Sequence, residues 1–334
     1  MALNHIWFLV VGFLFIGYFV LDGFDFGVGI SLPFLGKDDT DRRVLINTIG
    51  PVWDLNETWV LVAGASLFAS FPEWYASLFS GFYLALLLIL AALIARGVAF
   101  EYRSKGESTR WKATFDWMIF VGSALPALLW GVAFANIVEG VPLNAKHIYT
   151  GNLFTLLNAY GLMGGLTTLG VFWLHGLIFI TLKTDGEIKD RARQLAKRVG
   201  YGATVIAATF LLITLFQHFS IIGLLLTGVA AIALIAAQVA NWMKREGVAF
   251  TLMVVTIVTA VGALFAALYP NVLPSTTNVA YSLTIDNASS SQYTLTVMSW
   301  VAGLMIPFVL AYQAWTYWVF RNRISRKSIP AGSH

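Results

Sequence analysis

The stretch IWFLVVGFLFIGYFVLDGFDFGVGISLPFL, residues 6–35, decides what kind of protein this chain forms. About 20 mostly apolar residues let a helix cross the hydrocarbon core of a bilayer, so the stretch predicts a transmembrane helix. Two carboxylates, Asp22 and Asp25, interrupt it. Ionisable groups inside membrane helices are costly and face protein or water-filled cavities, which makes both residues functional candidates.

The same length test finds further apolar segments along the whole chain. They lie near 52–70, 75–101, 114–136, 154–182, 199–217, 219–240, 248–269 and 293–320. The composition agrees, because 58% of the residues are hydrophobic and only 11% are charged, whereas soluble domains average about 25% charged residues. We therefore predict an all-α integral membrane protein with about nine transmembrane helices. Short breaks at 71–73 and 218–219 predict two helical hairpins.

The basic residues predict the orientation in the membrane. All of the 21 Lys and Arg residues except Arg96 and Lys146 fall in the loops after segments one, three, five and seven or in the C-terminal tail. Cytoplasmic loops carry such an excess, so the N-terminus is expected outside and the C-terminus in the cytoplasm. The segment 270–292 has no Lys or Arg and is rich in Ser, Thr and Asn, which predicts an outward-facing cap.

Acidic groups gather near the cytoplasmic ends of the first two segments. Asp22 and Asp25 are three residues apart and share one helix face, while Gly23, Gly27 and Gly29 allow another helix close to it. Asp54 and Glu57 lie on one face at the start of the second segment.

A single basic residue belongs to the same layer. Arg96, in the third segment, reaches the level of the acids and can hold one carboxylate ionised. Acids and a base at one depth are what a proton-uptake path from the cytoplasm needs.

Alternatives remain open for these residues. Asp54 and Glu57 also suit a helix start, where the helix dipole favours acids, and Asp25 could form a structural ion pair with Arg96. Trp53 and Trp59 bracket Asp54; they could line a quinone or a subunit contact, or belong to the interfacial tryptophan belt.

Other chemistries lack their residues. The absence of cysteine excludes disulfides, iron–sulfur clusters and thiolate zinc sites. Of the five histidines only His175 falls within a predicted helix, and a lone helical histidine is more often packed or hydrogen-bonded than a ligand. We expect no catalytic or metal-binding residue in this chain and no haem ligation by it. The net charge of +4 follows from loop topology, so nucleic acid is not an expected partner.

Several motifs, in order, resemble one family. The stretch 22–29 (DGFDFGVG) is similar to the opening signature of subunit II of the cytochrome bd quinol oxidases. The other matching positions are Arg42, Arg43, Asn47, Trp53, Asp54, Asn56, Trp59, 80–83, Arg96, 100–103, 140–142, 149–152, 274–275, 282–284 and 288–290.

The resemblance implies an enzyme made of at least two subunits. Subunit I, with haems b and d, oxidises quinol and reduces oxygen, and a small single-helix subunit can complete the complex. This chain would hold no haem and would supply protons from the cytoplasm without a pump, in the bacterial cytoplasmic membrane. Some members also hold a structural quinone in this subunit.

The resemblance also implies an architecture and site roles. Two four-helix bundles, 1–136 and 137–269, would be followed by an outer loop, a last helix and a basic tail, 270–334. By the resemblance the proton path would use Asp25 and Asp54. Asp22 and Glu57, which lie at the same depth, are expected to belong to it as well. The residues expected to support it, by ion pairing or subunit contact, are Arg96, Trp53, Trp59 and Asn56.

Some positions depart from the family pattern. Leu21 stands where Thr often precedes the first aspartate, Gly97 and Ala159 replace common prolines, and the loop between segments six and seven is nearly absent.

Two other functions fit the same acids. A proton-coupled transporter also uses intramembrane carboxylates, although the internal repeat that a transporter of this size would need is not evident. A purely structural partner of a haem subunit fits everything except the clustered inner carboxylates.

Overall fold

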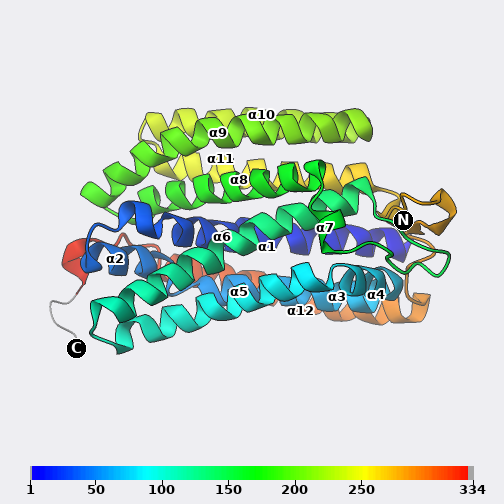
Figure 1. The fold of residues 1–334 in the computed structure, drawn as a ribbon, viewed down its shortest axis with the longest axis horizontal. Helices are drawn as coiled ribbons and strands as arrows, with labels where there is room; N and C mark the ends of the chain where they lie inside the picture. Colours follow the sequence, from blue (N-terminus) through cyan, green and yellow to red (C-terminus); the bar gives the residue numbers. More distant parts are fainter. Residues whose placement is uncertain (1, 330–334) are drawn as a thin grey trace.

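The computed structural model describes residues 2–329, and most of them belong to long helices that run along one axis (Figure 1). The helices are α1 Leu3–Leu35, α2 Asp39–Ile49, α3 Trp53–Ser70, α4 Pro72–Gly81, α5 Tyr83–Tyr102, α6 Thr109–Glu139, α7 Leu153–Leu156, α8 Ala159–Lys183, α9 Glu187–Gln217, α10 Ile221–Trp242, α11 Glu246–Leu268 and α12 Gln292–Val319. The shorter elements are η1 Arg103–Lys105, β1 Asn271–Leu273, η2 Val279–Tyr281, β2 Leu283–Thr284 and η3 Arg326–Ser328.

Within residues 2–329, eight helices are long and apolar enough to cross a membrane. They are α1, α5 with η1, α6, α8, α9, α10, α11 and α12. The predicted all-α membrane architecture is therefore confirmed. The 18-residue α3 occupies the predicted segment 52–70 but is not among the eight, so a ninth span stays a prediction.

Several helix boundaries differ from those expected. Segment 75–101 forms two helices that meet at Phe82. The junction is tight, because a Cβ on Gly81 would lie 2.6 Å from the Cβ of Tyr149. Segment 154–182 is also divided, since Asn158 caps a new helix by accepting a hydrogen bond from the Gly161 amide (2.7 Å).

Two helical regions lie in stretches expected to be loops. Helix α9 begins at Glu187, not near 199, and α2 was not expected. Both regions are rich in charged residues, so the apolar-length test, which finds only the part inside the hydrocarbon, overlooks them.

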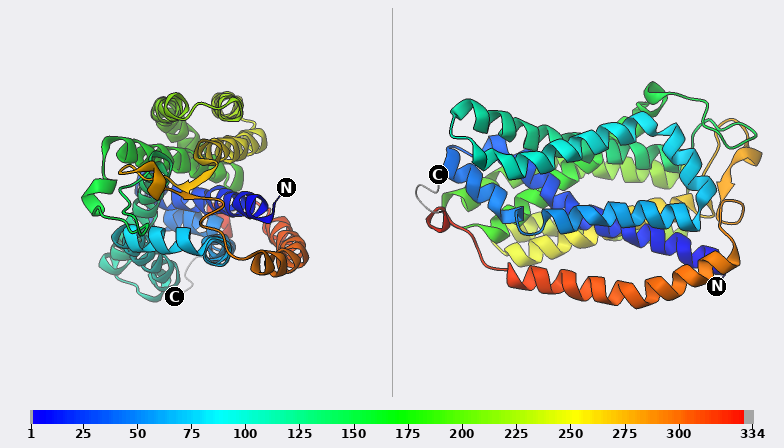
Figure 2. Two further views of the ribbon diagram at one scale, coloured as in Figure 1. Left: turned by 90° about the vertical axis from the view of Figure 1, so that its right-hand side faces the viewer. Right: turned by 90° about the horizontal axis from the view of Figure 1, so that it is seen from below.

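Helix α1 lies at the centre of the molecule and contacts α3, α6, α8 and α11 (Figure 2). At its crossing with α8 the backbones touch: a Cβ on Gly27 would lie 2.0 Å from the Phe172 carbonyl oxygen and 2.7 Å from Gly176. A Cβ on Gly29 would meet the Ser123 side chain of α6 at 2.0 Å. The predicted close approach at these glycines is confirmed, and it explains how α1 can be buried on several sides.

The other helices lie on two sides of α1. Helices α9, α10 and α11 pack together on one side, and α3, α5 and α12 lie on the opposite side (Figure 1). Helix α12 is the most peripheral, because only three of its residues, Leu295, Gln313 and Thr316, are buried. The division into 1–136, 137–269 and 270–334 stays a prediction.

The first and last residues that the structure describes lie at opposite ends of the molecule (Figure 1). Near the N-terminus, the segment after α11 folds over the helix ends: β1 pairs with β2, Leu283 and Ile285 are buried, and Asn4 donates a hydrogen bond to Asp286 (2.8 Å). This placement agrees with the expected outer cap.

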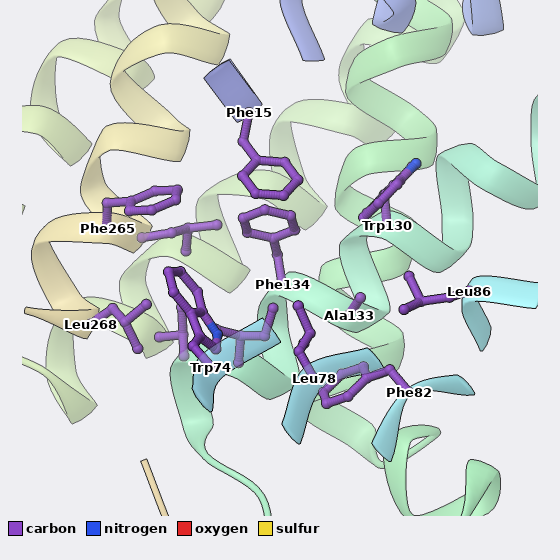
Figure 3. Close-up of a pocket in the computed structure, with 13 residues that line it drawn as sticks. Phe15, Trp74, Leu78, Phe82, Leu86, Trp130, Ala133, Phe134, Phe265 and Leu268 are labelled. Atoms are coloured by element: carbon purple, nitrogen blue, oxygen red, sulfur yellow. The ribbon is translucent and has the colours of Figure 1, made fainter. Parts of the chain in front are cut away.

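An aromatic cluster fills the core between α1, α4, α6 and α11 (Figure 3). Phe15 and Phe134 meet edge to face at 5.0 Å, and Trp74 and Phe265 close the sides. The remaining void is about 20 Å³, room for about one water molecule. Its lining is apolar, so the void is a packing feature and not a ligand site.

Candidate functional site: a buried cluster of acids and one base

Arg96 of α5 is fully buried at the meeting point of α1, α3 and α5. Its Nη2 donates to Asp22 Oδ1 at 2.7 Å and to Glu57 Oε2 at 3.0 Å. The guanidinium also lies 4.4 Å from the ring centre of Phe26, a cation–π contact. The structure thus joins three of the predicted residues, from three helices, in one ion-pair group.

Asp25 is buried beside this group but takes no part in the ion pairs. Its Oδ2 accepts a hydrogen bond from Asn56 Nδ2 at 2.8 Å. The Asn56 Oδ1 in turn accepts from Gln313 (3.0 Å) and Tyr317 (2.7 Å), both on α12. The alternative that Asp25 pairs with Arg96 is wrong for this structure, and the only side-chain partner of Asp25 within residues 2–329 is a neutral amide.

Several buried polar atoms in this layer lack a hydrogen-bond partner within residues 2–329. They are Asp22 Oδ2, Asp25 Oδ1, Arg96 Nε, Arg96 Nη1 and Ser123 Oγ. Buried polar groups are nearly always hydrogen-bonded to protein or to ordered water. Five such atoms in one layer therefore mark a place where bound water would complete the hydrogen bonding.

The remaining predicted residues surround the cluster. Asp54 is exposed at the start of α3 and makes no ion pair within residues 2–329, so unlike Glu57 it is not part of the ion-pair group. Trp53 packs on Phe100, with ring centres 5.2 Å apart. Trp59 is buried and donates to Gln313 Oε1 at 3.4 Å.

Sequence reasoning missed the partners that α12 and α6 supply. Gln313 and Tyr317 lie far along the chain from Asn56, and Trp130 donates to the hydroxyl of Tyr18 (3.1 Å) one turn before Asp22. Polar residues inside the last apolar segment were an available signal, because a Gln in a membrane helix needs a partner.

A second, larger group of ion pairs lies at the end of the molecule that holds α2, η1 and η3. Asp116 binds Arg42 (2.8 Å) and Arg103 (2.5 Å), and Asp41 binds Arg191 (2.6 Å) and Arg326 (2.5 Å). These pairs join loops that are distant in sequence, so the basic segments used to predict orientation do gather at one end.

The tail contributes to this group through Asp38. Arg326 Nη2 donates to Asp38 Oδ2 at 2.7 Å, and this hydrogen bond lowers the pKa of Asp38.

His175 is buried in α8 as a packed side chain. Its Nε2 lies 3.1 Å from the Val20 carbonyl oxygen, and its ring stacks on Phe250 at 4.9 Å. Residues 2–329 contain no group of three or more His, Asp or Glu side chains that could hold a metal ion.

The helices and the cluster define an integral membrane protein that holds ionisable groups between its helices. The family described as cytochrome bd terminal oxidase subunit II matches residues 3–320. Cytochrome bd ubiquinol oxidase subunit 2 of Bacillus subtilis (strain 168) is 40% identical over 331 residues, covering 98% of each chain. Cytochrome bd-I ubiquinol oxidase subunit 2 of Escherichia coli (strain K12) is 38% identical over 374 aligned residues, covering 100% of this chain and 98% of that one.

The chain therefore belongs to the cytochrome bd terminal oxidase subunit II family, as the motifs predicted. It is a subunit of a quinol:oxygen oxidoreductase, and its place as subunit II implies a partner, subunit I. The fold agrees: the structure of bd oxidase from Geobacillus thermodenitrificans superposes with a TM-score of 0.75 at 16% identity, covering 96% of this chain and 99% of that chain.

Proposed function

We propose that this chain carries protons from the cytoplasmic side toward the oxygen-reducing haems of its partner subunit. The observation that carries the proposal is the contrast between two buried aspartates one turn apart. Asp22 is fixed by Arg96, whereas Asp25 has no cation and offers one oxygen without a partner within residues 2–329. A carboxyl that is to gain and lose a proton needs this freedom, because an ion pair holds it charged.

Counting charges supports proton exchange at this cluster. Asp22, Asp25 and Glu57 share the single guanidinium of Arg96, so full ionisation would leave an excess of negative charge inside the membrane. An uncompensated buried charge costs several kcal/mol. The cluster therefore favours taking up a proton, and Asp25 is the member with no cation to replace it.

The route begins at the cytoplasmic end of α3. Asp54 is exposed there, and the side chain of Glu57 is 23% exposed while still touching Arg96. In the proposed order, Asp54 and Glu57 collect protons, and bound water next to the unpartnered oxygens of Asp22 and Asp25 passes them on. Trp53 and Trp59 act as walls of this route.

Asp25→Asn tests the proposal. The substitution keeps the shape and the contact with Asn56 but removes the exchangeable proton. Oxygen consumption should fall about 100-fold or more, the lower end of the range of general acid–base contributions, while the haem spectrum of the purified complex stays normal. Asp54→Asn should slow turnover less, because water can bypass an exposed entry group.

Asp22→Asn is the matched comparison. It removes the ion pair with Arg96, so its main effect should be a smaller amount of assembled, haem-containing complex, whereas the Asp25 variant should lose mainly turnover per haem. Loss of haem in the Asp25 variant would favour a purely structural role for this chain. Wild-type turnover in both the Asp25 and Asp54 variants would refute the proton assignment.

The structural quinone implied by the family would fit the cleft between α3 and α4–α5. The cleft measures about 530 Å³, within the usual range for ligand pockets, with Glu57 at one end and Tyr75, Phe79 and Tyr83 on its wall. Leu61→Trp, which fills the cleft, should lower the quinone extracted per complex, whereas Ile94→Trp on the exposed face of α5 should not. Equal quinone content in both variants would contradict this site.

The partners in this proposal are subunit I and a small single-helix subunit, in the bacterial cytoplasmic membrane. The support is the exposed face of α12, where Trp300 and Phe308 have no cover within residues 2–329. Affinity purification in mild detergent should recover a haem-containing protein with this chain. A colourless single chain that transports a solute would instead favour the transporter alternative.

A further inference from the structure

Helices α10 and α11 lie on the side of the molecule away from α12 (Figure 1). An open, shallow groove runs between them. Its volume is about 470 Å³, and all of its lining is apolar except Arg245. Ala236 and Ala240 supply small side chains along α10, and Ile235, Val239 and Leu252 are among the larger ones. The groove is thus suited to a flexible hydrocarbon chain.

The turn that joins α10 to α11 brings two cations to one end of this groove. Lys244 adopts a left-handed backbone (φ 58°), and the Arg245 amide donates to the Ala240 carbonyl at 2.9 Å. This is a Schellman motif, which ends α10 sharply and satisfies its last carbonyls. Arg245 lines the groove, and Lys244 precedes it in the turn.

Both cations lack a counter-charge of their own. Within residues 2–329, neither the Lys244 nor the Arg245 side chain makes an ion pair or a hydrogen bond, and both are exposed. The adjacent carboxylate, Glu246, is already bound by Lys189 at 3.1 Å and by Arg193. Two positive charges therefore remain unbalanced at the mouth of an apolar groove.

Aromatic residues place this mouth at the level of lipid headgroups. Trp242 is 41% exposed immediately before the turn, and its ring lies 6.0 Å from that of Tyr201 on α9. Trp and Tyr gather at membrane–water interfaces. The groove then extends from the headgroup level into the hydrocarbon.

We infer that this groove binds one anionic phospholipid of the cytoplasmic leaflet, with its phosphate at Lys244 and Arg245 and one acyl chain along Ala240 and Ala236. The charge of the mouth selects an anionic headgroup, and the apolar length selects a lipid over a soluble phosphate. The site lies on the far side of α1 from the acid cluster, so it is independent of the proposed proton route.

The absence of cysteine from this chain allows a direct test. The purified complex is used, with the cysteines of other subunits replaced, and a fluorophore is attached to Ile235→Cys. This position lies about 12 Å along the helix axis, at 1.5 Å per residue, from Met243 at the cationic end of the groove. Quenching is measured in vesicles that contain brominated phosphatidylglycerol or brominated phosphatidylcholine. A label at Ile94→Cys on α5, which is exposed and outside the groove, reports the bulk lipid.

Phosphatidylglycerol should quench the Ile235 label preferentially and the Ile94 label without preference. Lys244→Gln with Arg245→Gln should lower the preference about 30-fold, the factor that corresponds to about 1 kcal/mol for each of two basic residues near a membrane surface. Lys105→Gln with Arg110→Gln, two exposed cations on the same side of the membrane but outside the groove, should leave it unchanged.

Two further outcomes decide between lipid binding and simple surface charge. Ala236→Phe narrows the groove and should reduce the preference even though both cations remain. Equal quenching by the two lipids in the unchanged chain, or a preference that survives the double Gln variant, would overturn the inference. Loss of the preference on adding soluble glycerol phosphate would show a headgroup site without an acyl chain and would also overturn it.

Discussion

Replacing Arg96 by Met gives the sharpest test of whether its positive charge compensates the buried acids. Arg96 is fully buried, and its contacts with Asp22 (2.7 Å) and Glu57 (3.0 Å) are the only ion pairs of those two acids within residues 2–329. Asp22 has no exposed surface, so bulk solvent does not screen its charge once the guanidinium is removed. Removing one partner of a buried pair costs about 3–5 kcal/mol, because the other charge stays buried and uncompensated.

The expected result of Arg96→Met is a fall of about 5–10 °C in the thermal unfolding midpoint of the purified complex. Midpoints must be compared at one scan rate, since membrane complexes seldom unfold reversibly. Adding Asp22→Asn to Arg96→Met should recover most of the loss, because the fully buried carboxylate is then gone and Glu57 can turn toward solvent. An unchanged midpoint in Arg96→Met, or no recovery in the double variant, would refute the reasoning.

Two other predictions concern the close helix crossing and the tail. Gly27→Leu should prevent assembly of the complex, since even a Cβ would lie 2.0 Å from the Phe172 carbonyl oxygen. The control is Gly228→Leu, because the space around Gly228 is open. Equal yields of purified complex from the two variants would contradict the prediction. The lowered pKa of Asp38 means that its bond to Arg326 is complete above the unfolded pKa, about 3.9, and is lost as the pH falls through the lower folded value. Hydrogen exchange of residues 320–329, corrected for its intrinsic pH dependence, should therefore accelerate below about pH 4, and Arg326→Gln should already be fast at pH 7. Equal corrected exchange rates of residues 320–329 at pH 7 and below about pH 4 would show that the contact between Arg326 and Asp38 does not hold this segment in place.

Much of the fold could be predicted because a bilayer imposes a length and a composition on each crossing helix. The acids of α1 and α3 and the cation of α5 were found for the same reason, since charges stand out in apolar segments. The partners of Asp25 were not found, because the pairing of Asn56 with Gln313 and Tyr317 depends on how α12 lies against α3, and no local pattern encodes that. Whether Arg96 pairs with Asp22 or with Asp25 likewise depends on how α1 is rotated about its own axis, and a fraction of a turn decides it.

The attachment of α12 has a mechanical consequence. Near one end it holds the indole of Trp7 through Ser299 (3.0 Å), and near the other it is tied to Asn56 through Gln313. Between these ties a gap of about 520 Å³ separates it from α1 and α3, and Pro307 removes a backbone hydrogen bond midway. A helix that is held by hydrogen bonds near both ends and has a gap behind its middle bends easily there. The middle of α12 can therefore shift to fit an adjacent subunit while the hydrogen bonds of Ser299 and Gln313 stay in place.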